Sequence, residues 1–108
     1  MTRRLERATE VIKREVSAII PKCVDLGGAL LTLTRVELTE DLQYADVYFM
    51  VIPDRQRDEM NKVLAQNIFE IQHALNQRLR MRPVPKVRFH HDEAELEATK
   101  IDEFLKRV

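Results

Sequence analysis

Residues 29–52, with the sequence ALLTLTRVELTEDLQYADVYFMVI, decide the fold. Residues 29–38 are rich in Leu, Thr and Val, which favour extended backbone, and residues 44–52 form a second run of the same kind. Only a short turn at 39–42 separates the two runs, so we expect them to be antiparallel neighbours in one sheet. Polar positions become fewer toward the end of the second run, which predicts burial on both faces and a central place in the sheet.

The spacing of apolar residues predicts helices on both sides of this hairpin. In residues 4–20 the apolar side chains recur every three or four residues, which is typical of an amphipathic helix, and Pro21 is expected to end it. After Pro53 a single apolar stripe continues over many turns, which predicts one long helix. That stripe consists of Met60, Leu64, Ile68, Ile71, Leu75 and Leu79.

Residues 86–90, KVRFH, alternate polar and apolar side chains and predict a third, half-buried strand. Because a helix connects it with the second strand, the two are expected to be parallel, through a right-handed crossover. The fold class is therefore α+β: one domain, residues 1–108, with a three-stranded mixed sheet covered by helices on one face. A short C-terminal helix is expected from the spacing of Ala94, Ala98, Ile101, Leu105 and Val108.

The 18 basic and 18 acidic side chains cancel to a net charge of zero, which taken alone argues against a nucleic-acid partner. The charges are sorted along the chain, however. Segments 1–24 and 62–91 are net basic, and segments 25–61 and 92–108 are net acidic. We therefore expect a molecule with basic and acidic faces. The alternative is that segments of opposite charge attract one another across the fold.

The net basic segments supply the candidate RNA-binding residues. Basic side chains of the first helix, of the long helix and its end, and of one face of the third strand are predicted to present a positive strip to a phosphate backbone. For any one of them taken alone, the alternative is an ordinary solvated surface charge. The predicted RNA-binding residues are Arg3, Arg4, Arg7, Arg14, Lys62, Arg78, Arg80, Arg82, Lys86 and Arg88.

Phe69 does not fit the apolar stripe, because a straight helix places it well away from the other apolar side chains. Two interpretations are open. A bend of the helix, or packing against another element, would bury the ring in part, and this is the interpretation that we favour. The alternative is that the ring stacks on a nucleotide base.

No constellation of catalytic or metal-binding residues stands out in the sequence. Ser17 is the only serine, and Gly27-Gly28 lacks the spacing of a phosphate-binding loop. His90 and His91 are successive strand residues, which point to opposite faces and do not converge on one ion. We therefore expect no enzyme activity, no metal and no cofactor. The single Cys23 permits no internal disulfide, which is typical of a reducing cytosol, and no apolar run is long enough to span a membrane.

Three segments carry a resemblance to a known family. They are RLERA at 4–8 with IKRE at 12–15, VELTEDL at 36–42 with ADVY at 45–48, and LRMRPVPKVRF at 79–89 followed by Asp92. In this order and spacing they resemble the ribosome-binding factor A family over nearly the whole chain. The resemblance implies a type II KH-like fold. It also implies a cytoplasmic or organellar protein, expected to be monomeric, that binds rRNA of the immature small (30S) ribosomal subunit and assists its maturation.

The chain departs from the family pattern within the long helix. The family usually has an Ala-x-Gly kink there, followed closely by an arginine. Alignment back from Arg82 places Asn67-Ile68-Phe69 at the kink and Gln72 at the arginine. The kink is then either absent or formed in another way, such as insertion of a side chain into the helix hydrogen-bond ladder. RNA contacts that the family makes at that site are not carried over to this chain.

The hypothesis from the sequence is a non-catalytic assembly factor that binds small-subunit rRNA and assists processing and folding of 16S rRNA, with ribosomal proteins as further partners. Arginine and lysine would contact phosphates, so RNA shape would matter more than base sequence. One alternative is a protein–protein interaction module that associates through its exposed sheet edge and binds no RNA. The other is a small enzyme, for which the sequence contains no supporting motif.

Overall fold

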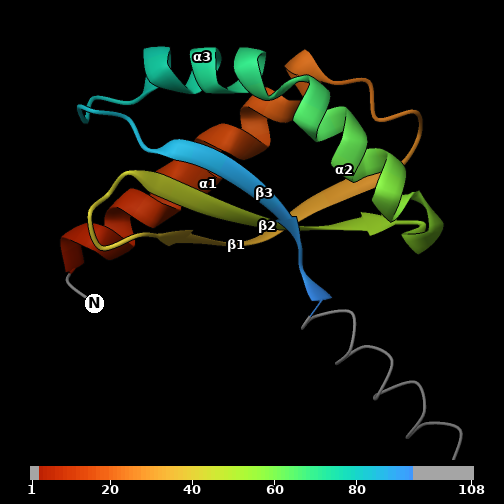
Figure 1. Ribbon diagram of the computed structural model, residues 1–108, viewed down its shortest axis with the longest axis horizontal. Coiled ribbons are helices and arrows are strands. Elements are labelled where there is room, and N and C mark those ends of the chain that lie inside the picture. The colour runs from red at the N-terminus through yellow and green to blue at the C-terminus, as the bar shows by residue number, and fades with distance from the viewer. Residues whose placement is uncertain (1–2, 94–108) are drawn as a thin grey trace, which may run out of the picture.

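The computed structural model describes residues 3–93, in which helices pack on one face of a three-stranded sheet (Figure 1). This arrangement confirms the predicted α+β class. The predicted C-terminal helix lies outside the described residues. The elements are helix α1 (Arg3–Cys23), strands β1 (Leu30–Leu38) and β2 (Tyr44–Ile52), the 3-10 helix η1 (Asp54–Gln56), helices α2 (Arg57–Gln66) and α3 (Ile68–Arg78), and strand β3 (Lys86–His91).

Strand β2 is the central strand, as predicted. It pairs antiparallel with β1 and parallel with β3, which confirms both the hairpin and the crossover. Only one face of β2 is fully buried; the side chains between the buried ones lie on the open face of the sheet and are half-buried, so burial on both faces holds only in part. The buried side chains, which face the helices, are Ala45, Val47, Phe49 and Val51.

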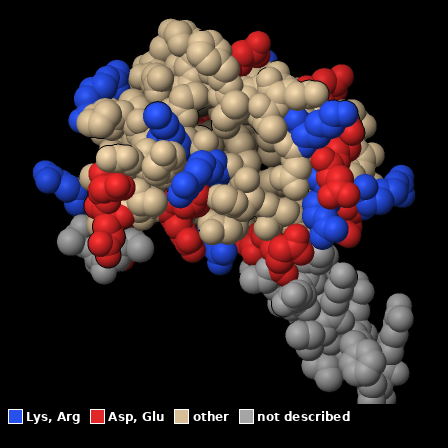
Figure 2. Space-filling view, in the orientation of Figure 1, with Lys and Arg blue, Asp and Glu red and all other residues tan. Residues whose placement is uncertain are grey.

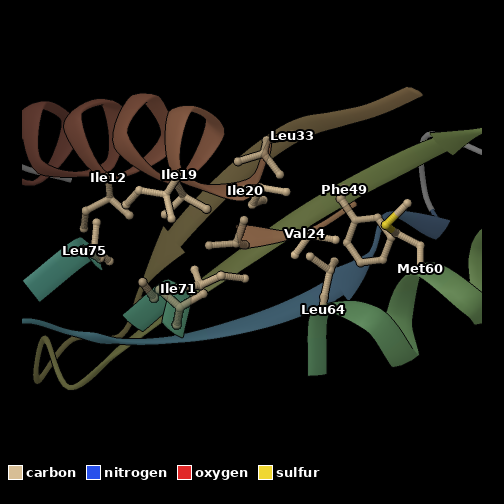
Figure 3. Close-up of a cluster of buried hydrophobic side chains, with 14 of the residues drawn as sticks. Ile12, Ile19, Ile20, Val24, Leu33, Phe49, Met60, Leu64, Ile71 and Leu75 are labelled. Atoms are coloured by element: carbon tan, nitrogen blue, oxygen red, sulfur yellow. The ribbon is translucent and has the colours of Figure 1, made fainter. Parts of the chain in front are cut away.

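The core lies between the sheet and the helices (Figure 3). Phe49 extends from the middle of β2 toward Met60 and Leu64 of α2 (Figure 3). The predicted stripe of the long helix is confirmed, because Met60, Leu64, Ile71, Leu75 and Leu79 are buried and Ile68 packs against them. Burial of a large apolar side chain contributes about 1.5–3 kcal/mol, so this cluster is what holds the helical layer on the sheet. Helix α1 adds Ile12, Val16, Ile19 and Ile20.

Helix α1 continues beyond Pro21 to Cys23, so the predicted end at Pro21 is wrong. A proline removes the hydrogen bond of its own nitrogen, and the neighbouring bonds can remain. Here the Val24 N–H still donates to the Ile20 carbonyl at 2.9 Å. The chain turns away only at Gly27 and Gly28, whose φ angles of 58° and 84° lie in the left-handed region that favours glycine.

The predicted long helix is divided at Asn67 into α2 and α3, and its axis changes direction there (Figure 1). The Asn67 side-chain Nδ2 donates to the Val63 carbonyl at 2.8 Å. The Asn67 backbone N–H is shared between the carbonyls of Val63 and Leu64, at 3.1 and 3.3 Å. A side chain bonded into the ladder therefore accompanies the kink, which is the second of the two possibilities considered from the sequence.

The kink does not bury Phe69. Its side chain is 81% exposed on the outer side of α3, so the packing interpretation is wrong. The preceding residue, Ile68, faces the core instead and packs against its buried side chains. Because successive helical residues point about 100° apart, Phe69 is left in solvent.

Gln72 joins α3 to the edge of β3. Its Nε2 donates to the Pro85 carbonyl at 3.1 Å, and the Val87 N–H donates to its Oε1 at 2.8 Å. These two bonds resemble those that a neighbouring strand would make, and they occupy this part of the β3 edge. The side chain that stands where the family has an arginine is therefore turned inward and bonds to the sheet.

Replacing Gln72 with alanine is expected to lower the free energy of unfolding by about 1–3 kcal/mol, because the Val87 N–H loses its partner. Urea unfolding followed by circular dichroism measures the effect. Gln77→Ala is the matched control, since the Gln77 amide is exposed and bonds only to exposed His73 among the described residues. Equal unfolding midpoints for the two variants would contradict the role of Gln72.

Candidate nucleic-acid interface

The two net basic segments meet at one end of the helical layer. The N-terminal half of α1 lies beside the C-terminal end of α3, and a groove of about 410 Å³ opens between them. Its floor includes the apolar side chains of Val11 and Met81. We call it the arginine groove, after the five arginines that border it: Arg4, Arg7, Arg14, Arg78 and Arg80.

Local structure explains why these arginines gather. On α1, residues 4, 7, 11 and 14 recur at intervals of three and four, so their side chains lie along one side of the helix. On the other wall, α3 ends at Arg78, and Leu79 adopts an extended conformation with its side chain in the core. Anchored in this way, Leu79 leaves Arg80 exposed at the rim of the groove.

Glu15 is the acidic side chain that borders the groove. Its carboxylate lies 3.1 Å from Arg78 Nη1 and 3.8 Å from Arg14 Nε. Within residues 3–93, no ion pair is found for Arg4, Arg7 or Arg80. Since a guanidinium group can bind two phosphate oxygens at once, these three arginines without an ion pair, around an apolar floor, suit a phosphate backbone.

Arg3 and Arg82 flank the arginine groove. Arg3 lies on α1 and borders a separate hollow with Glu6, Arg7 and Glu10. The Arg82 guanidinium donates to backbone carbonyls of Leu79, Met81 and Asn76, at 2.6, 2.7 and 3.1 Å. The bond to Asn76 pairs a carbonyl in the last turn of α3, where a helix leaves such groups unpaired, and the other two bonds hold the backbone that follows the helix. Arg82 is therefore engaged with the backbone that follows α3, and its contact with RNA stays a prediction.

The other three predicted residues lie elsewhere. Lys86 and Arg88 share one face of β3, as predicted, but that is the open face of the sheet, opposite the helices. Arg88 donates to Asp46 through Nε and Nη2, at 2.8 and 3.0 Å, and its guanidinium lies 4.1 Å from the centre of the Tyr44 ring. Lys62 is exposed on α2, at the other end of the molecule from the start of α1 (Figure 1).

Asp46 is the charge centre of the open face. Besides its bonds with Arg88, it lies 2.8 Å from His90 Nε2. The hydrogen bond with Arg88 lowers the pKa of Asp46 below its ordinary value of 3.8, and His90 adds to this effect, while burial of the carboxylate opposes it. Arg88 is thus largely neutralised within the protein, unlike Arg4, Arg7 and Arg80 of the groove.

The pair of Asp46 and Arg88 is expected to make the free energy of unfolding depend on pH in the acidic range. Because its pKa is lowered in the folded protein, Asp46 binds a proton more readily in the unfolded chain. Its contribution to the free energy of unfolding is therefore present above about pH 4 and is lost as the pH falls through the lowered pKa. Asp46→Asn should therefore be less stable than wild type at neutral pH, with the two converging in acid. Urea unfolding at a series of pH values tests this, with Glu40→Gln, an exposed carboxylate without an ion pair among the described residues, as control. A difference independent of pH would contradict it.

The two adjacent histidines lie on opposite faces of the sheet, as predicted. His91 packs edge-on against Phe49 on the helix side, with ring centres 5.5 Å apart, and His90 lies beside Tyr48 on the open face. Among residues 3–93, no group of three or more His, Cys, Asp or Glu side chains could hold a metal ion. None of the helices in that range is long and apolar enough to cross a membrane.

Two features escaped the reasoning from sequence. The pairing of Asp46 with Arg88 follows from the register between β2 and β3, and parallel strands have no tight turn that sets their register. The apolar floor of the groove could have been predicted in part from the sequence, since Val11 is an apolar residue in line with the arginines of α1. The contribution of Met81 to this floor, however, appears only once α3 is folded against α1.

Comparisons with known proteins agree with this architecture. The family model for ribosome-binding factor A matches residues 4–105. The ribosome-binding factor A of Chlorobium luteolum is 33% identical over 111 residues, which cover 100% of this chain and 93% of that relative. The crystal structure of ribosome-binding factor A from Thermus thermophilus matches with a TM-score of 0.72 and 26% identity, covering 81% of this chain and 94% of that chain.

A further likeness is one of fold. A homology model of Thermus thermophilus ribosome-binding factor A, fitted into a cryo-EM map of a 30S–RbfA complex, matches with a TM-score of 0.58 and 21% identity. The match covers 87% of this chain and 97% of that one.

Proposed function

Because the chain belongs to the ribosome-binding factor A family, we propose that it binds rRNA of the immature small ribosomal subunit through the arginine groove and assists maturation of that subunit. The observation that carries this proposal is the set of three arginines, Arg4, Arg7 and Arg80, that border one groove without an ion pair among the described residues. The Thermus thermophilus homologue fitted into a map of its 30S complex supports the small subunit as the partner.

The proposed binding is by phosphate contacts. Arg4 and Arg7 on one wall and Arg80 on the other would hold a backbone between them, and the apolar floor would lie under the sugars. Such contacts orient the protein on the RNA and recognise its shape more than its sequence. Binding stabilises one rRNA conformation at the expense of others, which favours folding and processing of 16S rRNA without a catalytic step. We propose that the chain does this as a monomer in the cytoplasm.

Association through a sheet edge is less well supported. The exposed edge strand, β1, carries a bulge between Leu33 and Arg35, and Lys13 Nζ donates to the Thr34 carbonyl at 3.4 Å. Bulges and charged side chains are devices that prevent strand addition. The β3 edge is occupied in part by Gln72. Neither edge therefore offers the long, regular run of free backbone groups that such a module needs.

The test is binding to purified precursor small subunits. Arg7→Glu combined with Arg80→Glu, the groove variant, reverses one charge on each wall. Lys22→Glu combined with Arg55→Glu, the control variant, makes the same change of net charge at exposed residues outside the groove. Only the groove variant should lose co-sedimentation with precursor subunits and the footprint on their rRNA. Equal loss in both variants, or in neither, would contradict the proposed interface.

A further inference from the structure

Phe69 is the most exposed of the large hydrophobic side chains in residues 3–93, at 81%, compared with 59% for Leu30 and 61% for Ile52. Its ring adds nothing to the core, yet it is held in a defined place as the second residue of α3, directly after the kink at Asn67. The kink, with the Asn67 side chain bonded to Val63, fixes the direction in which α3 starts and therefore the side on which the ring lies.

One side of α3 leads from this ring to the arginine groove. Phe69, His73 and Gln77 follow one another at intervals of four residues, so they lie along one side of the helix. That side ends beside Arg78 and Arg80, on the wall of the groove. At 1.5 Å per residue, Phe69 and Arg78 are about 14 Å apart along the axis, a distance that about four stacked nucleotides span.

The surface between them is polar and nearly free of charge. His73 and Gln77 are hydrogen-bonded to each other at 3.3 Å, and Glu70 is the one acidic residue of α3. The space-filling view shows a mostly uncharged surface over α2 and α3, with basic and acidic side chains at its margins (Figure 2). Neutral side chains of this kind can form hydrogen bonds with base edges without repelling the phosphates beside them.

We propose that Phe69 stacks on an unpaired base of the RNA strand whose backbone lies in the arginine groove, an inference that rests on the proposed function. A protein partner fits this surface less well. Protein interfaces are centred on a contiguous apolar patch, whereas the helical neighbours of Phe69 at four residues are Ala65 and His73. A single exposed ring with polar surroundings matches the flat face of one base.

The chain contains no tryptophan, so Phe69→Trp introduces a single fluorescent indole at the proposed stacking position. Titration with single-stranded oligouridine should quench this fluorescence, and Phe69→Trp should bind with wild-type affinity. Phe69→Ala should bind the same RNA about fivefold to a hundredfold more weakly, the range found for loss of one stacked base. A fully paired RNA duplex should show no such difference, because its bases are not available for stacking.

Leu30→Ala is the matched control, since it removes an exposed apolar side chain on β1, away from α3, and should bind as wild type. If Phe69→Ala binds as wild type and Phe69→Trp is not quenched, while the groove variant has lost RNA binding, the inference about Phe69 fails and the arginine groove stands. If the groove variant binds as wild type, the proposed function fails. Weaker binding of Phe69→Ala to subunits but not to protein-free RNA would place a protein on the ring and overturn the inference.

Discussion

The groove variant, Arg7→Glu with Arg80→Glu, is expected to bind small-subunit rRNA at least a hundredfold more weakly than wild type. A hydrogen bond to a charged group contributes about 1.5 kcal/mol or more, so two lost phosphate contacts correspond to about 3 kcal/mol, or two decades in the dissociation constant. Repulsion between the new carboxylates and the phosphates adds to this loss. Because both arginines lie at the surface and form no ion pair among the described residues, the fold should be unaffected.

The salt dependence of RNA binding distinguishes the loss of phosphate contacts from a general loss of affinity. The logarithm of the affinity falls with the logarithm of the salt concentration, by about 0.7 for each phosphate neutralised on a single strand. The groove variant should therefore show a slope smaller by about 1.4. The control variant, Lys22→Glu with Arg55→Glu, should keep the wild-type slope. Parallel slopes for wild type and the groove variant would show that these arginines do not contact phosphate.

Phe49→Ala is expected to lower the free energy of unfolding by about 3–5 kcal/mol, the range for loss of a buried aromatic side chain. The ring is fully buried in the central strand and lies beside Met60 and Leu64 (Figure 3). Truncation leaves a cavity between sheet and helices, and the rigid strands on either side of β2 limit how far it can collapse. Since small domains are stable by about 5–15 kcal/mol, this single change removes a large share of the total.

Phe69→Ala is the matched control for this experiment, because it removes the same side chain from the surface and is expected to change stability by about 0.5 kcal/mol at most. Urea unfolding of both variants measures the contrast. The two variants distinguish the roles of the two phenylalanines: Phe49→Ala should lower stability, and Phe69→Ala should weaken RNA binding. Similar destabilisation by the two substitutions would contradict the placement of both rings.

The elements that could be predicted are those with a local pattern. The strands, the amphipathic first helix and the stripe from Met60 to Leu79 follow from periodicity. Buried positions recur every second residue in a strand and every three or four residues in a helix, so they can be recognised in the sequence. The hairpin follows from a turn too short for any other connection. Where prediction failed, as at Pro21, the helix continues because the proline removes only its own hydrogen bond, and the Val24 N–H still donates to the Ile20 carbonyl.

The interface was predictable only as a set of candidates. Ten basic residues were named from the sequence, and five of them border one groove. The sequence could not show that Arg88 is paired and Arg80 is not. The partner of Arg88 is Asp46, which lies 42 positions away in the sequence and is brought to 2.8 Å by the parallel register of β2 and β3. Burial of Phe69 was likewise open from the sequence, because a bend of the helix or a neighbouring element could have covered the ring, and only the folded chain shows that it is 81% exposed.

Local sequence patterns were sufficient for the class of fold, the order of elements and the segregation of charge into basic and acidic segments, since each of these is a property of neighbours along the chain. Only the folded chain shows which of the charged side chains discussed above are paired within the protein and which are not. It placed the arginines of α1 beside those after α3, paired Arg88 with Asp46 on the opposite face, and turned Gln72 toward β3. The physical reason is that electrostatic and hydrogen-bond interactions act through distances in space, and those distances are set by packing of the core.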